Sequence, residues 1–301
     1  MKVDLEIYPE FASEMVLSIP YAYYLHNRGE LGKVSICRGM KPFYYFAEDV
    51  VEVFSNRSLD NGAALKNIPN QWLHHYDGVD GVINYEEWEV PPYEEHFKNN
   101  LFDSLKPFII VNNIYNEPWL GNGCFDIKNL YDIFTYLTET GYNVVYKRPT
   151  NKEFAVDQNE YHTTSTDIFA EVEGIGTIND YQLCDYFDNV ININKLWEET
   201  KLDYSTLNLS LFSETEGFIT PAGAGSQLFA FYKKPLLMYL TRGREVERYG
   251  YLNNEDCYYK RLADTPLHLL YDNHKDWGGD VSNRKYDKLL ETIKNVYRGV
   301  K

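Results

Sequence analysis

A turn of small residues between an expected strand and an expected helix carries the most chemical information in this sequence of 301 residues. Such a turn lets backbone N–H groups at the start of a helix approach a phosphate, and the helix dipole adds attraction. The alternative is a tight strand-to-helix connection that binds nothing, because the pattern matches neither the dinucleotide fingerprint nor the P-loop. The candidate phosphate-binding residues are Gly223, Ala224, Gly225, Ser226 and Gln227.

Three arginines could place positive charge beside this turn. Arg242 and Arg244 follow the next expected strand, and Arg148 ends an earlier one. Ligands of open parallel sheets bind outside the carboxyl ends of the strands, and guanidinium groups pair well with phosphate oxygens. We therefore predict an anion site at this edge. Acidic residues follow the first two arginines, so a solvated helix with internal ion pairs is the alternative for that segment.

The overall charge requires any anion site to be local. Lysine and arginine number 29 against 45 aspartate and glutamate, which gives a formal net charge of −16. A surface this acidic repels phosphate backbones and anionic lipid headgroups, so nucleic-acid binding and membrane-surface binding are not expected.

Signatures of several other chemistries are missing from the sequence. There is no Asp-x-Asp, which metal-dependent sugar transfer commonly uses, and the cysteines and histidines lack zinc-site spacing. The segment Gly223–Ser226 is not the nucleophile elbow of a serine hydrolase. We therefore expect no metal and no cofactor.

The elements that must position these residues alternate between strand and helix, which predicts an α/β fold with parallel sheets. Expected strands are Val3–Tyr8, Gly32–Arg38, Phe108–Asn112, Tyr142–Tyr146, Val190–Ile193, Phe218–Thr220, Leu236–Thr241 and Leu267–Tyr271. Expected helices are Glu14–Arg28, Asp126–Thr140, Tyr204–Glu214, Ser226–Tyr232 and Asn283–Arg298, and the region Ser55–Pro92 is expected to be rich in loops. Two α/β domains are predicted, 1–104 and 105–282, with 283–301 as a last helix that could return to the first domain.

This organisation resembles the GT-B-fold glycosyltransferases, in which two Rossmann-like domains face a cleft. Two segments are similar to the heptosyltransferase-like (lipopolysaccharide ADP-heptose transferase) superfamily. Ser13–Pro20 looks like the start of that family's first helix, and Phe218–Pro235 looks like its donor-binding strand, turn and helix. Val111–Trp119 is a weaker match to the first strand and loop of its donor domain.

The resemblance implies an enzyme that moves a sugar from a nucleotide-sugar donor to a glycan or other hydroxyl acceptor, as in polysaccharide biosynthesis. Glu14 falls where the family places its acidic base, with Glu10 as a substitute, and Asn112 and Asn113 join the donor site. One base and no metal imply an inverting transfer in which backbone and arginine groups stabilise the leaving group. The alternative for Glu14 is helix capping. The sequence departs from the family near Ala222 and just before Trp119, so we expect a hexosyl- or pentosyltransferase.

Two other interpretations keep the same fold. One is a nucleotide-sugar epimerase, and the other is a non-catalytic protein that binds a nucleotide or a glycan. The 27 tyrosines, 16 phenylalanines and 5 tryptophans fill a core in the simplest interpretation, although those near Tyr21, Tyr44, Trp88 and Tyr93 could line an acceptor groove. The acidic N-terminus lacks a signal-peptide core and no apolar run could span a bilayer, so a cytoplasmic protein with reduced thiols is expected.

Overall fold

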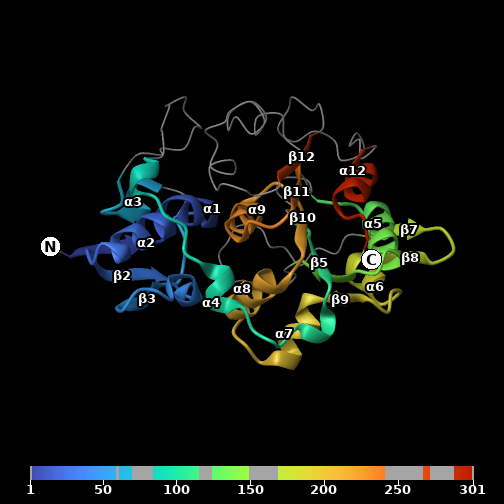
Figure 1. Ribbon diagram of the computed structural model, residues 1–301, viewed down its shortest axis with the longest axis horizontal. Coiled ribbons are helices and arrows are strands. Elements are labelled where there is room, and N and C mark those ends of the chain that lie inside the picture. The colour runs from blue at the N-terminus through green and yellow to red at the C-terminus, as the bar shows by residue number, and fades with distance from the viewer. Residues whose placement is uncertain are drawn as a thin grey trace.

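The computed structural model describes residues 2–58, 61–69, 84–114, 124–148, 169–240, 267–271 and 288–299 (Figure 1). The strands are β1 Val3–Ile7, β2 Leu31–Cys37, β3 Val50–Phe54, β4 Leu65–Lys66, β5 Phe108–Asn112, β6 Asn143–Lys147, β7 Phe169–Val172, β8 Gly176–Asn179, β9 Val190–Asn192, β10 Gly217–Pro221, β11 Leu236–Leu240 and β12 Leu267–Tyr271. The helices are α1 Phe11–Ser13, α2 Ile19–Asn27, α3 Asn61–Ala64, α4 Tyr93–Phe97, α5 Ile127–Glu139, α6 Asp180–Cys184, α7 Ile193–Thr200, α8 Tyr204–Glu214, α9 Ala224–Phe229 and α12 Leu289–Val296. The π turn Glu14–Ser18 and the 3-10 turns Lys41–Tyr44, Tyr85–Glu87, Asp103–Leu105 and Ala230–Tyr232 complete these elements. The predicted α/β class with two parallel-sheet units is confirmed.

The first unit is built on a four-stranded sheet of order β3-β2-β1-β4. Strands β1, β2 and β3 are parallel, and the short β4 closes the other edge antiparallel to β1. Leu5, Ile7, Val34 and Ile36 are fully buried, so alternate residues of the two central strands supply the core.

The first helix begins earlier than expected and is interrupted. Ser13 makes no capping hydrogen bond, and the helix starts at Phe11 after Glu10. The π turn from Glu14 to Ser18 then leads into α2, whose second residue is Pro20. Proline has no N–H to donate to the preceding turn, and π turns are common at functional sites.

The second unit is a six-stranded parallel sheet of order β12-β11-β10-β5-β6-β9. Helices α5, α6 and α12 pack on one face, and α7, α8 and α9 pack on the other. Every residue of β5 and β10 is buried because both faces are covered, which explains their continuous apolar runs. From β5 the chain first adds β6 and β9 on one side, and it then returns to add β10, β11 and β12 on the other side. The direction in which strands are added therefore reverses between β5 and β10.

One hydrophobic cluster runs through both units. Tyr93 of α4 is fully buried, donates a 2.7 Å hydrogen bond to the Phe43 carbonyl and stacks on Phe231 and Tyr232. Glu214 at the end of α8 accepts from the Asn99 amide at 2.6 Å, so the connection between the units is also fixed to the second unit. The two units therefore share a continuous core.

The described part of the last helix does not return to the first unit. Helix α12 packs against α5 and β11, and the Tyr136 hydroxyl donates to the Tyr297 carbonyl at 2.8 Å. The amphipathic face of α12 is thus used within the second unit.

The aromatic residues expected to line a groove mostly fill the core. Tyr44 and Tyr93 are fully buried, and Trp88 donates its indole N–H to the Val16 carbonyl at 2.6 Å. Tyr21 is only half-buried, and its ring stacks with that of Tyr24. Core packing therefore accounts for Tyr44, Tyr93 and Trp88. No helix within the described ranges is both long and apolar enough to cross a bilayer, and the described cysteines are buried free thiols.

We predict that stability falls steeply above about pH 10 because of four buried tyrosines. Burial raises the pKa of each phenol above its ordinary value near 10, so the folded state holds the proton more tightly than the unfolded state. This contribution is complete below about pH 10 and decreases by about 1.4 kcal/mol per pH unit per tyrosine as pH rises toward the folded pKa. Phenolate absorbance should therefore appear together with the loss of circular dichroism, and free titration in a folded protein would contradict the prediction. The four are Tyr44, Tyr93, Tyr146 and Tyr232.

Candidate functional site

The reversal of strand order between β5 and β10 marks the candidate site. Doubly wound sheets bind ligands in the crevice outside the carboxyl ends of the strands at such a point. Asn112 ends β5, and Thr220 and Pro221 end β10, with the glycine turn directly after them. The predicted donor-site residues Asn112 and Gly223–Gln227 therefore lie at neighbouring strand ends.

A polar network crosses this point. The Asn112 side-chain amide donates to the Thr220 hydroxyl at 2.9 Å, and the Lys147 ammonium donates to the Asn112 side-chain oxygen at 3.3 Å. Asn112 and Thr220 are buried, and Lys147 is half-buried. Strands β6, β5 and β10 thus contribute one linked side chain each.

Side-chain alternation separates Asn112 from Asn113. Asn113 accepts from the Phe125 amide at 2.8 Å and donates to the Phe125 carbonyl at 3.0 Å and to the Tyr146 hydroxyl at 3.2 Å. These partners belong to the α5 side of the sheet. Asn113 therefore fixes the chain before α5.

Arg148 is likewise on the α5 and α6 side. Its guanidinium makes two hydrogen bonds to the Asp180 carboxylate, one of them at 2.7 Å, and lies 4.6 Å from the centre of the Tyr181 ring. Tyr146 donates to the same carboxylate at 2.7 Å. Burial lowers the pKa of Arg148, but the hydrogen bonds to Asp180 and the electrostatic interactions with Tyr146, Asp180 and Tyr181 together outweigh it, so its pKa lies above the usual value. Arg148 is 1% exposed, and this arrangement is a buried ion pair.

The glycine turn closes partly on itself. The Gly223 amide donates to the Ser226 hydroxyl at 3.3 Å, and the Ser226 hydroxyl and amide both donate to the Gly223 carbonyl, at 2.6 and 3.0 Å. These two amides are therefore engaged within the turn itself.

The second glycine of the turn lies close to Asn112. A Cβ atom added at Gly225 would make an ordinary van der Waals contact with the Asn112 amide nitrogen, at 3.6 Å. The Gln227 side-chain oxygen is shielded from solvent and has no hydrogen-bond partner among the described residues.

Glu14 is completely buried in the π turn. It forms an ion pair with Arg57, whose side chain is 4% exposed, and accepts from the Tyr44 hydroxyl at 2.9 Å. Arg57 also donates to the Pro9 carbonyl at 2.8 Å. Burial and the neighbouring Glu14 carboxylate raise the pKa of Tyr44 well above its usual value, which keeps this phenol a hydrogen-bond donor. Tyr44 and Arg57 thus both donate hydrogen bonds to the buried Glu14 side chain.

The structure brings the Glu14 turn and the glycine turn of the second unit together. Helix α1 and the π turn both pack against α9, as Figure 1 shows at its centre. Glu10, the substitute candidate, lies immediately before α1 and is only partly buried. The segment that carries Glu14 therefore lies against α9, while the Glu14 carboxylate itself contacts Tyr44 and Arg57 of the first unit.

Other predicted features fall outside the described residues. Arg242 and Arg244 are among them, as is the segment around Trp119. No group of three histidine, cysteine or acidic side chains suited to a metal ion occurs in the described part of the chain.

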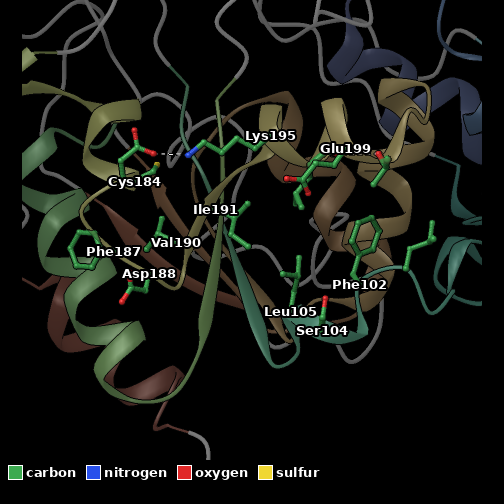
Figure 2. Close-up of a pocket in the computed structure, with 14 residues that line it drawn as sticks. Phe102, Ser104, Leu105, Cys184, Phe187, Asp188, Val190, Ile191, Lys195 and Glu199 are labelled. Atoms are coloured by element: carbon green, nitrogen blue, oxygen red, sulfur yellow. Dashed lines mark hydrogen bonds and ion pairs between the residues drawn. The ribbon is translucent and has the colours of Figure 1, made fainter.

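A groove of about 420 Å³ lies at the opposite, amino edge of the second sheet (Figure 2). Leu105, Val190 and Leu196 form part of its apolar wall, and an ion pair of 2.6 Å joins Lys195 to Asp185 at its rim. Strands of an open parallel sheet bind ligands at their carboxyl ends, so this groove is separate from the candidate site.

Lys147 is a residue of the candidate site that the sequence pattern did not single out. Arg148 follows it directly, and both come at the end of an expected strand. Alternation along β6 places Val145 on the α8 side and Val144 and Tyr146 on the α5 side. Extending that alternation by two residues would have placed Lys147, and not Arg148, on the face that holds Asn112.

No family model and no curated protein sequence matches this chain. Among solved structures, E. coli heptosyltransferase WaaC with ADP matches over 92% of this chain and 71% of its own, with 9% identity and a TM-score of 0.38. E. coli ADP-heptose lipopolysaccharide heptosyltransferase II matches over 92% of this chain and 74% of its own, with 10% identity and a TM-score of 0.38. A glycosyl transferase family 9 protein from Veillonella parvula matches over 92% and 63%, with 10% identity and a TM-score of 0.35. These proteins are of the kind that the sequence resembles, but the likeness is too distant to transfer a residue role or an activity.

Proposed function

We propose that this protein is a glycosyltransferase that takes its sugar from a nucleotide-sugar donor. The observation that carries the proposal is the glycine turn beside Asn112 and Thr220 at the point where the strand order of a doubly wound sheet reverses. This is the position at which such sheets bind nucleotides. The sequence resemblance of the first helix and of the donor segment supports sugar transfer as the reaction.

In this proposal the second unit binds the donor and the first unit contributes the base. Glu14 accepts the proton of the acceptor hydroxyl, which belongs to a glycan or a glycoconjugate, and the sugar is transferred with inversion. Positive and polar groups at the crossover stabilise the diphosphate leaving group without a metal. A hexosyl- or pentosyltransferase of polysaccharide biosynthesis in the cytoplasm fits this set of roles.

A non-catalytic nucleotide- or glycan-binding protein is the second candidate. The complete burial of Glu14 and its ion pair with Arg57 favour it, since a base must come within hydrogen-bond reach of the acceptor hydroxyl. In such a protein the Glu14–Arg57 pair is a structural element of the first unit.

Thermal unfolding in the presence of UDP, GDP, ADP, CMP and dTDP tests the donor site. A nucleotide that binds only the folded protein at 100 times its Kd stabilises that protein by about 2.7 kcal/mol, so the matching nucleotide should raise the Tm by several degrees. Adenosine and uridine without phosphate are the controls and should give smaller shifts.

The same screen separates the two candidates when nucleotide sugars are added. Slow release of the nucleoside diphosphate from the matching donor supports a transferase. Binding without release from any donor supports the second candidate, and the absence of any shift would contradict both.

A further inference from the structure

We infer that Lys147 is the cation that binds the diphosphate of the donor. The inference rests on the proposed function and names the charged contact of that site. Arg148, which the sequence suggested for this role, lies in a buried ion pair on the opposite face of the sheet. The amides of Gly223 and Ser226 are engaged within their own turn. A side-chain cation near the turn would add to whatever the remaining amides of the turn supply.

The position of Lys147 in the sheet is the first part of the argument. It ends β6, which pairs with β5, and β5 pairs with β10 on its other side. The ammonium reaches sideways to Asn112, so it lies toward the crossover between β5 and β10. A positive charge there is one strand away from the glycine turn.

The network around Lys147 is the second part. Asn112 accepts from Lys147 and donates to Thr220, so its side chain is held in one orientation between the two strands. Gly225 of the glycine turn lies beside the same Asn112 amide, which is 3.6 Å from the position of an added Cβ. In this inference, a phosphate group bound at the turn interacts with the ammonium of Lys147.

The charge of the molecule is the third part. With a net charge of −16, the long-range field opposes a diphosphate, and a nearby cation must overcome it. A flexible ammonium acts on phosphate as a point charge and can follow either phosphate group. We therefore expect Lys147 to matter more for a nucleoside diphosphate than for the corresponding monophosphate.

The experiment measures equilibrium binding by calorimetry with the nucleoside diphosphate that stabilises the wild-type protein and with its monophosphate. Lys147→Met should weaken diphosphate binding at least 10-fold and monophosphate binding less than about 3-fold. Lys147→Arg should stay within about 3-fold of the wild type. Lys128→Met removes the same charge from an exposed position on α5 and should bind like the wild type.

The outcomes separate this inference from the proposed function. If Lys147→Met binds the diphosphate as tightly as the wild type, Lys147 is not the phosphate cation, and the proposed function stands. If the wild type binds none of the nucleoside diphosphates, the donor site itself is wrong and the inference fails with it. Lys147→Gln keeps a polar side chain and repeats the measurement should the methionine variant fold poorly.

Discussion

Replacing Arg148 with methionine is expected to lower the free energy of unfolding by about 3–5 kcal/mol. The guanidinium is 1% exposed and binds both oxygens of Asp180, whose side chain is 0% exposed. Removing one partner of a buried pair leaves an uncompensated charge, and this is the main cost. Chemical denaturation followed by circular dichroism measures the loss.

The neighbouring lysine supplies the matched control. Lys147→Met removes one positive charge at the adjacent position, and we expect a loss below about 1 kcal/mol because Lys147 is only half-buried and donates to the neutral side chain of Asn112. The double variant Arg148→Met with Asp180→Asn should recover part of the loss, since it removes both charges. If Arg148→Met were as stable as the wild type but bound nucleotide more weakly, Arg148 would be a phosphate-binding residue and not a structural one.

Lys147 and Arg148 differ in a property that the sequence predicts poorly, namely the face of the sheet to which a side chain at the end of a strand belongs. A strand that is buried on both faces has a nearly continuous apolar sequence, and Phe108–Asn112 was predicted with the bounds that the structure has. The edge strand Leu267–Tyr271 was also predicted with the observed bounds. Helix α5 was recognised from its ends, where Asp126 caps the Asn129 amide and Gly141 has a φ of 92°. Local chemistry determined these elements.

Features that depend on distant contacts were not predictable in the same way. The sequence gives no local sign that Arg57 returns to Glu14 across 43 residues, or that the turn at Glu14 is a π turn. The hairpin of β7 and β8 lies in a polar stretch, where the period of the hydrophobic pattern is weak. Similarly, the end of a strand was visible, but the face to which each terminal side chain belongs depends on the register.

The Glu14–Arg57 pair determines how the proposed chemistry can be tested. Tyr44 and Arg57 hold the carboxylate in one position, which suits both a base and a structural anchor. Stability alone cannot separate these roles, because either one makes Glu14 costly to replace. A readout of turnover beside a readout of nucleotide affinity does separate them.

Glu14→Gln is expected to reduce release of the nucleoside diphosphate from the matching donor sugar by about 10²–10⁴-fold. Glutamine keeps the shape of the side chain and can still accept from Tyr44, but it cannot take a proton from an acceptor hydroxyl at neutral pH. Nucleotide affinity, measured by calorimetry at a temperature where the variant is folded, should change less than about 3-fold, because the donor contacts lie on the second unit.

Two matched variants make this result specific. Tyr44→Phe removes a hydrogen bond to Glu14 and leaves its charge, so turnover should fall far less than in Glu14→Gln. Glu48→Gln removes a carboxylate that is 88% exposed and should leave turnover unchanged. If Glu10→Gln loses turnover while Glu14→Gln retains it, the half-buried carboxylate before α1 is the base and the buried one is an anchor. If Glu14→Gln loses stability and nothing else, the ion pair with Arg57 holds the turn in place and takes no proton.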